Sequence, residues 1–93
     1  MTIDLIKLQL KNIPKSSGIY KFLDAKDNVL YVGKAKNLLK RVSSYTNKNS
    51  LSSRILRMIT LAQKVEYVIT KTEVEALLLE HNLIKQLSPN FNI

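Results

Sequence analysis

Two tyrosines lie close together in segment 18–41, GIYKFLDAKDNVLYVGKAKNLLKR, beside a stretch that is rich in lysine. Tyr20 and Tyr31 are two of only four tyrosines in the chain. Gly33 follows Tyr31 by two positions, where the missing side chain lets a backbone or a ligand approach closely. The pair has two interpretations: two hydroxyls directed at a phosphate, or two aromatic rings that belong to a hairpin.

Glu80 is a second residue whose type does not fit its surroundings. On a helix of 3.6 residues per turn, its neighbours lie three and four positions away. They are Ala76, Leu77, Leu83 and Ile84, all apolar, and Leu87 extends the stripe. We therefore expect Glu80 in the middle of the buried face of a helix. Because an unpaired buried carboxylate is costly, Glu80 is either one half of a structural ion pair with a lysine or a functional group, namely a metal ligand or a base.

The positive charge of the chain is concentrated in its middle. The net charge is +8, and no acidic residue lies between Asn28 and Val65. The basic residues of this segment are Lys34, Lys36, Lys40, Arg41, Lys48, Arg54, Arg57 and Lys64. A block of one sign indicates a polyanionic partner, with nucleic acid as the first candidate and an anionic membrane surface as the second. The alternative is a solvated surface without a ligand.

The periodicity of the chain predicts the elements that carry these residues. Residues 2–10 indicate a short helix that ends before Pro14, and 18–23 and 29–33 indicate a hairpin around the turn DAKDN. A helical spacing follows through Ala35 and Val42, then the polar loop TNKNS and a second helix at 51–62. Residues 65–70 alternate as a third strand. Thr72 and Glu75 form a capping box for a last helix that reaches Leu87. The predicted fold is α+β, a small three-stranded antiparallel sheet flanked by helices.

Length and composition limit the class of protein. Ninety-three residues predict one domain, 1–93, which we divide into an N-terminal helix at 1–12 and a core at 13–93. The absence of cysteine excludes disulfides, thiolate metal sites and a thiol nucleophile. No apolar run reaches the length of a membrane span, and the N-terminus is too polar for a signal peptide. We expect a cytoplasmic protein.

Several segments resemble a known family. GIY at 18–20 and YVG at 31–33 look like the paired signature of the GIY-YIG nucleases. Three longer segments, IPKSSGIY at 13–20, VLYVGKAKNLLKRVSSY at 29–45 and TEVEALLLEHNLIKQLSPNFNI at 72–93, resemble the N-terminal domain of UvrC, the incising subunit of bacterial nucleotide excision repair. Ser17 departs from the proline that is usual there. A complete UvrC continues well beyond this sequence, so the chain is either an excised domain or a small stand-alone relative.

The resemblance implies roles for individual residues. The positions that match catalytic or site-framing residues of the family are Tyr20, Tyr31, Lys34, Arg41, Tyr45 and Asn92. Glu80 matches the sole protein ligand of one divalent cation, Mg²⁺ or Mn²⁺. In that interpretation Tyr31 takes a proton from the attacking water, Tyr20 orients the water, and Arg41 holds the scissile phosphate. We assign contacts with the DNA backbone to Lys36, Asn37, Lys40, Lys48, Arg54 and Arg57.

The implied function is a metal-dependent DNA endonuclease that makes the 3′ incision near a lesion. The implied partners are damaged double-stranded DNA and, if the chain is part of a full-length UvrC, a UvrB-type repair protein; we expect no membrane partner. Two alternatives remain open. One is a stand-alone GIY-YIG nuclease that acts on another DNA substrate, and the other is a nucleic-acid-binding module without catalytic activity.

Overall fold

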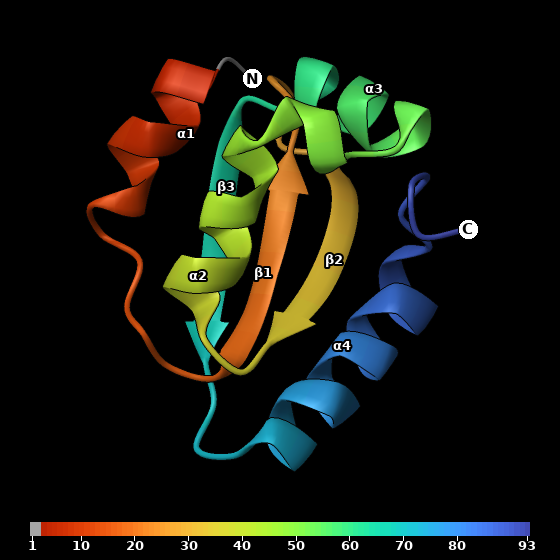
Figure 1. The fold of residues 1–93 in the computed structure, drawn as a ribbon. Coiled ribbons are helices and arrows are strands. Elements are labelled where there is room, and N and C mark those ends of the chain that lie inside the picture. The colour runs from red at the N-terminus through yellow and green to blue at the C-terminus, as the bar shows by residue number, and fades with distance from the viewer. Residues whose placement is uncertain (1–2) are drawn as a thin grey trace.

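An antiparallel sheet with the strand order β2-β1-β3 forms the centre of the molecule, which a computed structural model describes over residues 3–93 (Figure 1). The strands are β1 (Gly18–Leu23), β2 (Val29–Ala35) and β3 (Lys64–Ile69). The helices are α1 (Ile3–Leu10), α2 (Leu38–Ser43), α3 (Ser53–Leu61) and α4 (Glu73–Leu87). The predicted fold class is therefore confirmed.

The register of the central strand determines which residues share a face of the sheet. Tyr20 on β1 lies opposite Gly33 on β2, and Phe22 lies opposite Tyr31. Because directly opposed residues point to the same side of a sheet, the two tyrosines of the motif share one face. This face packs against α1, α2 and α3, which contribute Ile6, Leu38, Val42, Met58 and Ile59 to the core.

The opposite face of the sheet is covered by α4, which contacts β2 and β1 (Figure 1). Ile19 and Val32 are fully buried on this side. Ala76 is the most buried residue of α4, while Leu77 and Leu87 are 48% and 46% exposed. The expectation that both leucines belong to the buried face was wrong. Ala76 is the one fully buried residue of α4, so the apolar stripe of this helix is wider than the surface that it buries.

The starts of the helices follow from capping side chains. Asn37 accepts the N–H of Lys40 at 3.0 Å and begins α2 at Leu38, so Ala35 ends β2 instead of opening the helix. Thr72 accepts the N–H of Glu75 at 3.1 Å, as the capping box predicts. The loop TNKNS contributes to two short 3₁₀ turns, Ser44–Thr46 and Lys48–Ser50.

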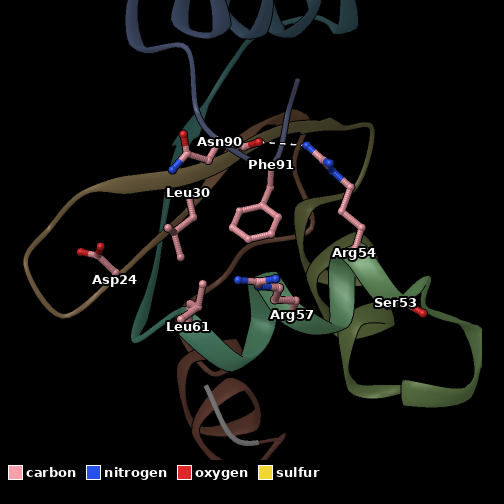
Figure 2. A pocket seen from close by; sticks show the side chains of 8 residues that line it. All are labelled: Asp24, Leu30, Ser53, Arg54, Arg57, Leu61, Asn90 and Phe91. Atoms are coloured by element: carbon pink, nitrogen blue, oxygen red, sulfur yellow. Dashed lines mark hydrogen bonds between the residues drawn. The ribbon is translucent and has the colours of Figure 1, made fainter.

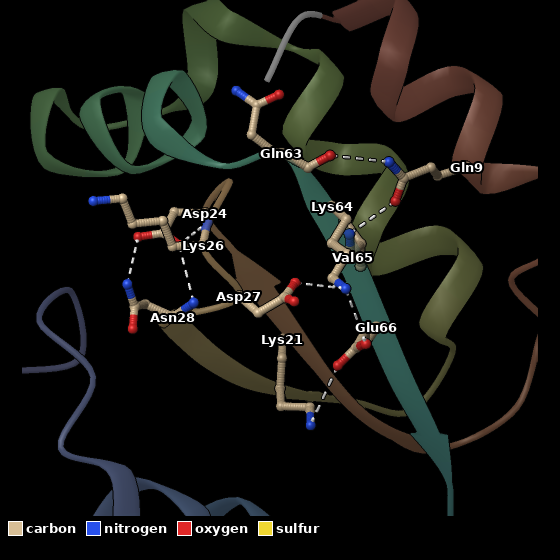
Figure 3. A network of polar contacts seen from close by, with 10 residues as sticks. All are labelled: Gln9, Lys21, Asp24, Lys26, Asp27, Asn28, Gln63, Lys64, Val65 and Glu66. Atoms are coloured by element: carbon tan, nitrogen blue, oxygen red, sulfur yellow. Dashed lines mark hydrogen bonds and ion pairs between the residues drawn. The ribbon is translucent and has the colours of Figure 1, made fainter.

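A polar network joins the hairpin turn to β3 (Figure 3). The carboxylate of Asp24 accepts the N–H groups of Lys26 and Asn28, both at 2.9 Å, and thereby closes the turn. Lys64 pairs with Asp27 at 2.7 Å and with Glu66 at 3.7 Å. The last basic residue of the central block is therefore neutralised within the fold. Over residues 3–93, no helix combines the length and the apolar character needed to cross a membrane.

Candidate active site

Three predicted site residues from three elements meet through their side chains. The hydroxyls of Tyr20 on β1 and Tyr45 in the turn after α2 are 2.7 Å apart. Arg41 on α2 donates its Nε–H to the Tyr20 hydroxyl at 3.2 Å, and its guanidinium lies 5.5 Å from the centre of the Tyr45 ring. The side chains of Tyr20 and Tyr45 are thus packed in the core, and Arg41 meets the hydroxyl of the first and the ring of the second.

Burial determines the protonation of this cluster. The pKa values of Tyr20 and Tyr45 are both raised above the usual tyrosine value, mainly because the charged form of each would lose its solvation. The pKa of Arg41 is raised too, chiefly by electrostatic interaction with Tyr20. At neutral pH both hydroxyls therefore keep their protons. The Tyr20 hydroxyl accepts the Nε–H of Arg41, and the Tyr45 hydroxyl pairs with that of Tyr20.

Tyr31 occupies a different environment from Tyr20. Its ring centre is 6.3 Å from that of Tyr20, but its side chain is half-buried and lines a hollow of about 270 Å³. Arg41 and Tyr45 line the same hollow. Tyr20 is therefore a core aromatic residue whose hydroxyl is hydrogen-bonded, whereas Tyr31 borders a hollow, and the phosphate contact of its hydroxyl stays a prediction.

The hollow also contains residues that the sequence analysis missed. Its remaining lining residues are Ser44, Ser50, Leu51, Ser52 and Ile55. Periodicity placed Leu51 and Ile55 on the apolar side of a helix and gave no position to the serines. The high serine content of segment 43–53 is the only sequence signal for the polar side of this hollow. Serine content alone does not show that this segment lies near Tyr31.

Gly33 is required by the position of Tyr20, and we predict that Gly33→Ala disrupts the site. A Cβ atom at residue 33 would lie 2.3 Å from both Cζ and the hydroxyl oxygen of Tyr20. Overpacking of this kind costs about 1–3 kcal/mol of stability. We expect a lower melting temperature together with impaired cleavage; a variant with parental melting and parental activity would show that Tyr20 moves aside freely.

A second hollow, of about 550 Å³, adjoins the first and is basic. It is lined by Lys34, Ala35, Lys36, Asn37, Lys40, Arg41 and Ser44. Arg41 and Ser44 belong to both hollows, so the lysines continue the surface on which Tyr31 lies. Lys36 is exposed and has one distant ion pair, to Glu73 at 3.9 Å. The side-chain oxygen of Asn37 already accepts a hydrogen bond in the cap of α2. If Asn37 contacts DNA as predicted, only its amide NH₂ group is left to do so.

Two predicted site residues bind the protein itself. Asn92 accepts the N–H of Val32 at 2.8 Å and donates to the carbonyl of Val32 at 2.9 Å, so its carboxamide positions β2. Arg54 donates to the carbonyl of Asn90 at 2.9 Å and also to that of Ile93. These contacts hold residues 90–93 in place, and the catalytic role of Asn92 and the DNA contact of Arg54 stay predictions.

The remaining basic candidates are separate from the cluster. Arg57 is exposed and lines a third hollow, of about 680 Å³, with Asp24, Leu30, Phe91 and Asn90 (Figure 2). Lys48 is exposed in the second 3₁₀ turn. Neither residue lines the hollow of Tyr31. Both remain free to meet a polyanion at the periphery.

Glu80 is half-buried on α4, near the middle of that helix. Over residues 3–93 its carboxylate has no ion pair, so the structural interpretation of this residue has no partner among the described lysines. The described residues contain no group of three or more potential metal-ligating side chains of histidine, cysteine, aspartate or glutamate. The candidate donor is thus a single carboxylate. This fits Mg²⁺, which keeps several of its water ligands and is commonly held by one or two carboxylates and the substrate.

Sequence comparison supports the resemblance over most of the chain. Residues 16–93 match the family described as the UvrC-like GIY-YIG domain. The UvrABC system protein C of Bartonella henselae is 52% identical over 89 residues, and that of Neisseria gonorrhoeae is 54% identical over 88. These alignments cover 96% and 95% of this chain but 14% of each relative. The chain therefore spans a small part of the length of these curated relatives.

Solved structures agree with the sequence comparison. The magnesium-bound GIY-YIG N-terminal endonuclease domain of UvrC from Thermotoga maritima matches with a TM-score of 0.85 and 34% identity, over 95% of this chain and 96% of that one. Point mutants of the Thermotoga domain, in which one asparagine becomes alanine or one of three tyrosines becomes phenylalanine, are also bound to the catalytic divalent cation. Their TM-scores are 0.85 and 0.84.

Proposed function

This chain belongs to the family of UvrC-like GIY-YIG domains, and we propose that it is a divalent-cation-dependent endonuclease that hydrolyses a phosphodiester bond of DNA. The observation that carries the proposal is the shared hollow of Tyr31, Arg41 and Tyr45. It brings the phenol of Tyr31 next to the guanidinium of Arg41, which is held by the buried Tyr20 hydroxyl and the Tyr45 ring. Such a pair provides a proton acceptor and a phosphate ligand in one place.

The roles of the tyrosines follow from their burial. Tyr31 carries the hydroxyl that borders the hollow; after releasing its own proton to solvent, its phenolate would accept a proton from the attacking water, directly or through a relay. Tyr20 is only 1% exposed, and its hydroxyl already bonds to Tyr45 and Arg41. We therefore change the expected role of Tyr20 from orienting water to positioning Arg41. The guanidinium of Arg41 would bind the scissile phosphate and offset its developing charge.

Glu80 would hold the divalent cation. When bound, such a cation acts as a Lewis acid that stabilises the leaving 3′ oxygen. In the Thermotoga domain the cation is still present when one asparagine or one tyrosine is replaced, which agrees with a carboxylate as the protein ligand. We propose Mg²⁺ or Mn²⁺, one ion per domain.

The proposed substrate is double-stranded DNA, and the proposed context is the 3′ incision of nucleotide excision repair. The relatives are components of the UvrABC system, and this chain corresponds to 14% of their length. We infer that lesion recognition and contact with a UvrB-type partner depend on other parts of such an assembly. A cytoplasmic location follows from that context.

A nicking assay tests the proposed function. The purified protein is incubated with a damaged duplex that is loaded with the repair partners, and with supercoiled DNA alone, in Mg²⁺, in Mn²⁺ and in chelator. We expect cation-dependent nicking that chelator stops and added cation restores. Nicking of the supercoiled DNA alone would favour a stand-alone nuclease. Binding without nicking under any of these conditions would favour a non-catalytic module.

The basic hollow gives a prediction for DNA affinity. Lys36 and Lys40 are exposed and line the hollow that continues from Arg41. Each phosphate contact contributes roughly one unit to the slope of log affinity against log salt. We expect Lys36→Ala and Lys40→Ala each to weaken binding evenly across sequences and to flatten this slope by about one unit. Titrations at several salt concentrations measure both; an unchanged slope would mark the lysines as solvated surface.

A further inference from the structure

Arg54 on α3 binds the segment that follows α4 through three contacts. Its Nη2 donates to the carbonyl of Asn90 at 2.9 Å and also to the carbonyl of Ile93. Its guanidinium carbon lies 5.7 Å from the centre of the Phe91 ring. Figure 2 shows Arg54 reaching from α3 toward Asn90, with the Phe91 ring between Leu30 and Arg54. The side chain thus fixes residues 90–93, which we call the C-terminal strap, to α3.

The C-terminal strap in turn occupies the open edge of β2. The strand order leaves that edge without a neighbouring strand. Phe91 donates its N–H to the carbonyl of Leu30 at 3.0 Å, and Asn92 bonds to both backbone groups of Val32. These two contacts lie on the residues directly before and after Tyr31. The strap therefore serves as a short substitute for a strand partner at the position of the proposed base.

We propose that Arg54 is a positioning residue for Tyr31 and acts through the C-terminal strap. The proposal rests on the proposed function of Tyr31 as the base. It assigns to Arg54 a role beyond neutralising phosphate, because its Nη2 already donates to two carbonyls and its guanidinium lies near the Phe91 ring. Since proton transfer depends on short and well-aligned contacts, loss of the anchor should slow the chemical step more than it weakens DNA binding.

Arg57 provides a matched control on the same helix. It lies about one turn after Arg54, is exposed and lines the same hollow, and its side chain has no hydrogen bond or ion pair over residues 3–93. Arg54→Ala and Arg57→Ala remove the same charge from neighbouring positions. Only the first variant removes the anchor of the strap.

Amide hydrogen exchange tests the strap without any cleavage. The N–H groups of Val32 and Phe91 are protected by the contacts of the strap. We expect Arg54→Ala to speed the exchange of both by about ten-fold or more, the equivalent of one lost hydrogen bond, and Arg57→Ala to leave both unchanged. Unchanged exchange in Arg54→Ala would overturn the proposal. Hydrogen exchange does not depend on cleavage. The test therefore distinguishes a wrong assignment of Arg54 as the anchor of the strap from a wrong assignment of the protein as a nuclease.

Kinetics test the effect on Tyr31. We expect Arg54→Ala to lower the single-turnover rate by about ten-fold while its DNA dissociation constant stays within about three-fold of the parent. Asn92→Ala should have a similar effect, and the double variant should cost little more than either single change, because both act through one strap. Additive losses of rate in the double variant, or a rate loss explained by weaker DNA binding alone, would overturn the proposal.

Arg54→Lys keeps the charge but not the planar guanidinium. We expect its cleavage rate and its amide exchange to lie between those of the parent and those of Arg54→Ala. Parental affinity, exchange and rate in Arg54→Lys would show that Arg54 acts only through its positive charge, which would overturn the proposal.

Discussion

Tyr31→Phe should reduce the single-turnover rate of cleavage by at least about a hundred-fold, because a positioned general base contributes about 10²–10⁴-fold. The variant removes one oxygen from a half-buried ring and leaves the ring in place beside Tyr20. DNA affinity should stay within a few-fold of the parent, since one hydroxyl is a small part of a basic surface. Rapid-quench measurements at saturating enzyme separate the rate from the affinity.

Tyr67→Phe is the matched control for this prediction. Tyr67 lies on β3, and its hydroxyl donates to the carbonyl of Asn12 at 2.8 Å, outside the hollow of Tyr31. The same oxygen is lost, but we expect cleavage at the parental rate. If Tyr31→Phe also cleaves at the parental rate, Tyr31 is only a packing residue and the mechanism has no base.

Glu80→Gln should abolish cleavage and largely keep the fold. A cation that stabilises charge in a transition state contributes several kcal/mol, so loss of its protein ligand should lower the rate by about a thousand-fold or more. Over residues 3–93 the carboxylate has no ion pair whose loss could destabilise the protein. The melting temperature should therefore stay the same or rise. Cleavage in Mg²⁺ and in Mn²⁺, thermal melting and calorimetric titration with cation measure the three effects.

Glu75→Gln removes a charge of the same sign from the same helix and serves as the control. The carboxylate of Glu75 accepts the N–H of Lys71 at 3.0 Å, and a glutamine oxygen can accept it as well. We expect normal cleavage and nearly normal stability. If Glu80→Gln cleaves normally in Mg²⁺, or melts far below the parent, Glu80 is a structural residue and the cation has another ligand.

The elements of this protein could be predicted because the signals are local. A capping box at Thr72, turn residues around Asp24 and a change of apolar period after Gly33 each report on contacts within a few residues. The apolar spacing predicted a helix from Ala35, but α2 begins at Leu38. The spacing of apolar residues continues through Ala35 and does not show that Asn37 caps the helix. The motif residues themselves could be matched without a structure, since the resemblance depends on residue type and order.

Only the tertiary structure decided where each motif residue lies and which groups it contacts. Tyr20 and Tyr31 have the same side chain, yet the register of β1 against β2 and the burial by α2 make one a buried support of Arg41 and the other the wall of a cavity. Likewise, Arg54 belongs to a basic block in the sequence and binds a carbonyl 36 residues away in the fold. The pKa of a phenol and the partner of a guanidinium depend on desolvation and on contacts between segments that are distant in the sequence. Desolvation and distant contacts produce no periodic pattern of residue types, so they could not be predicted from the sequence.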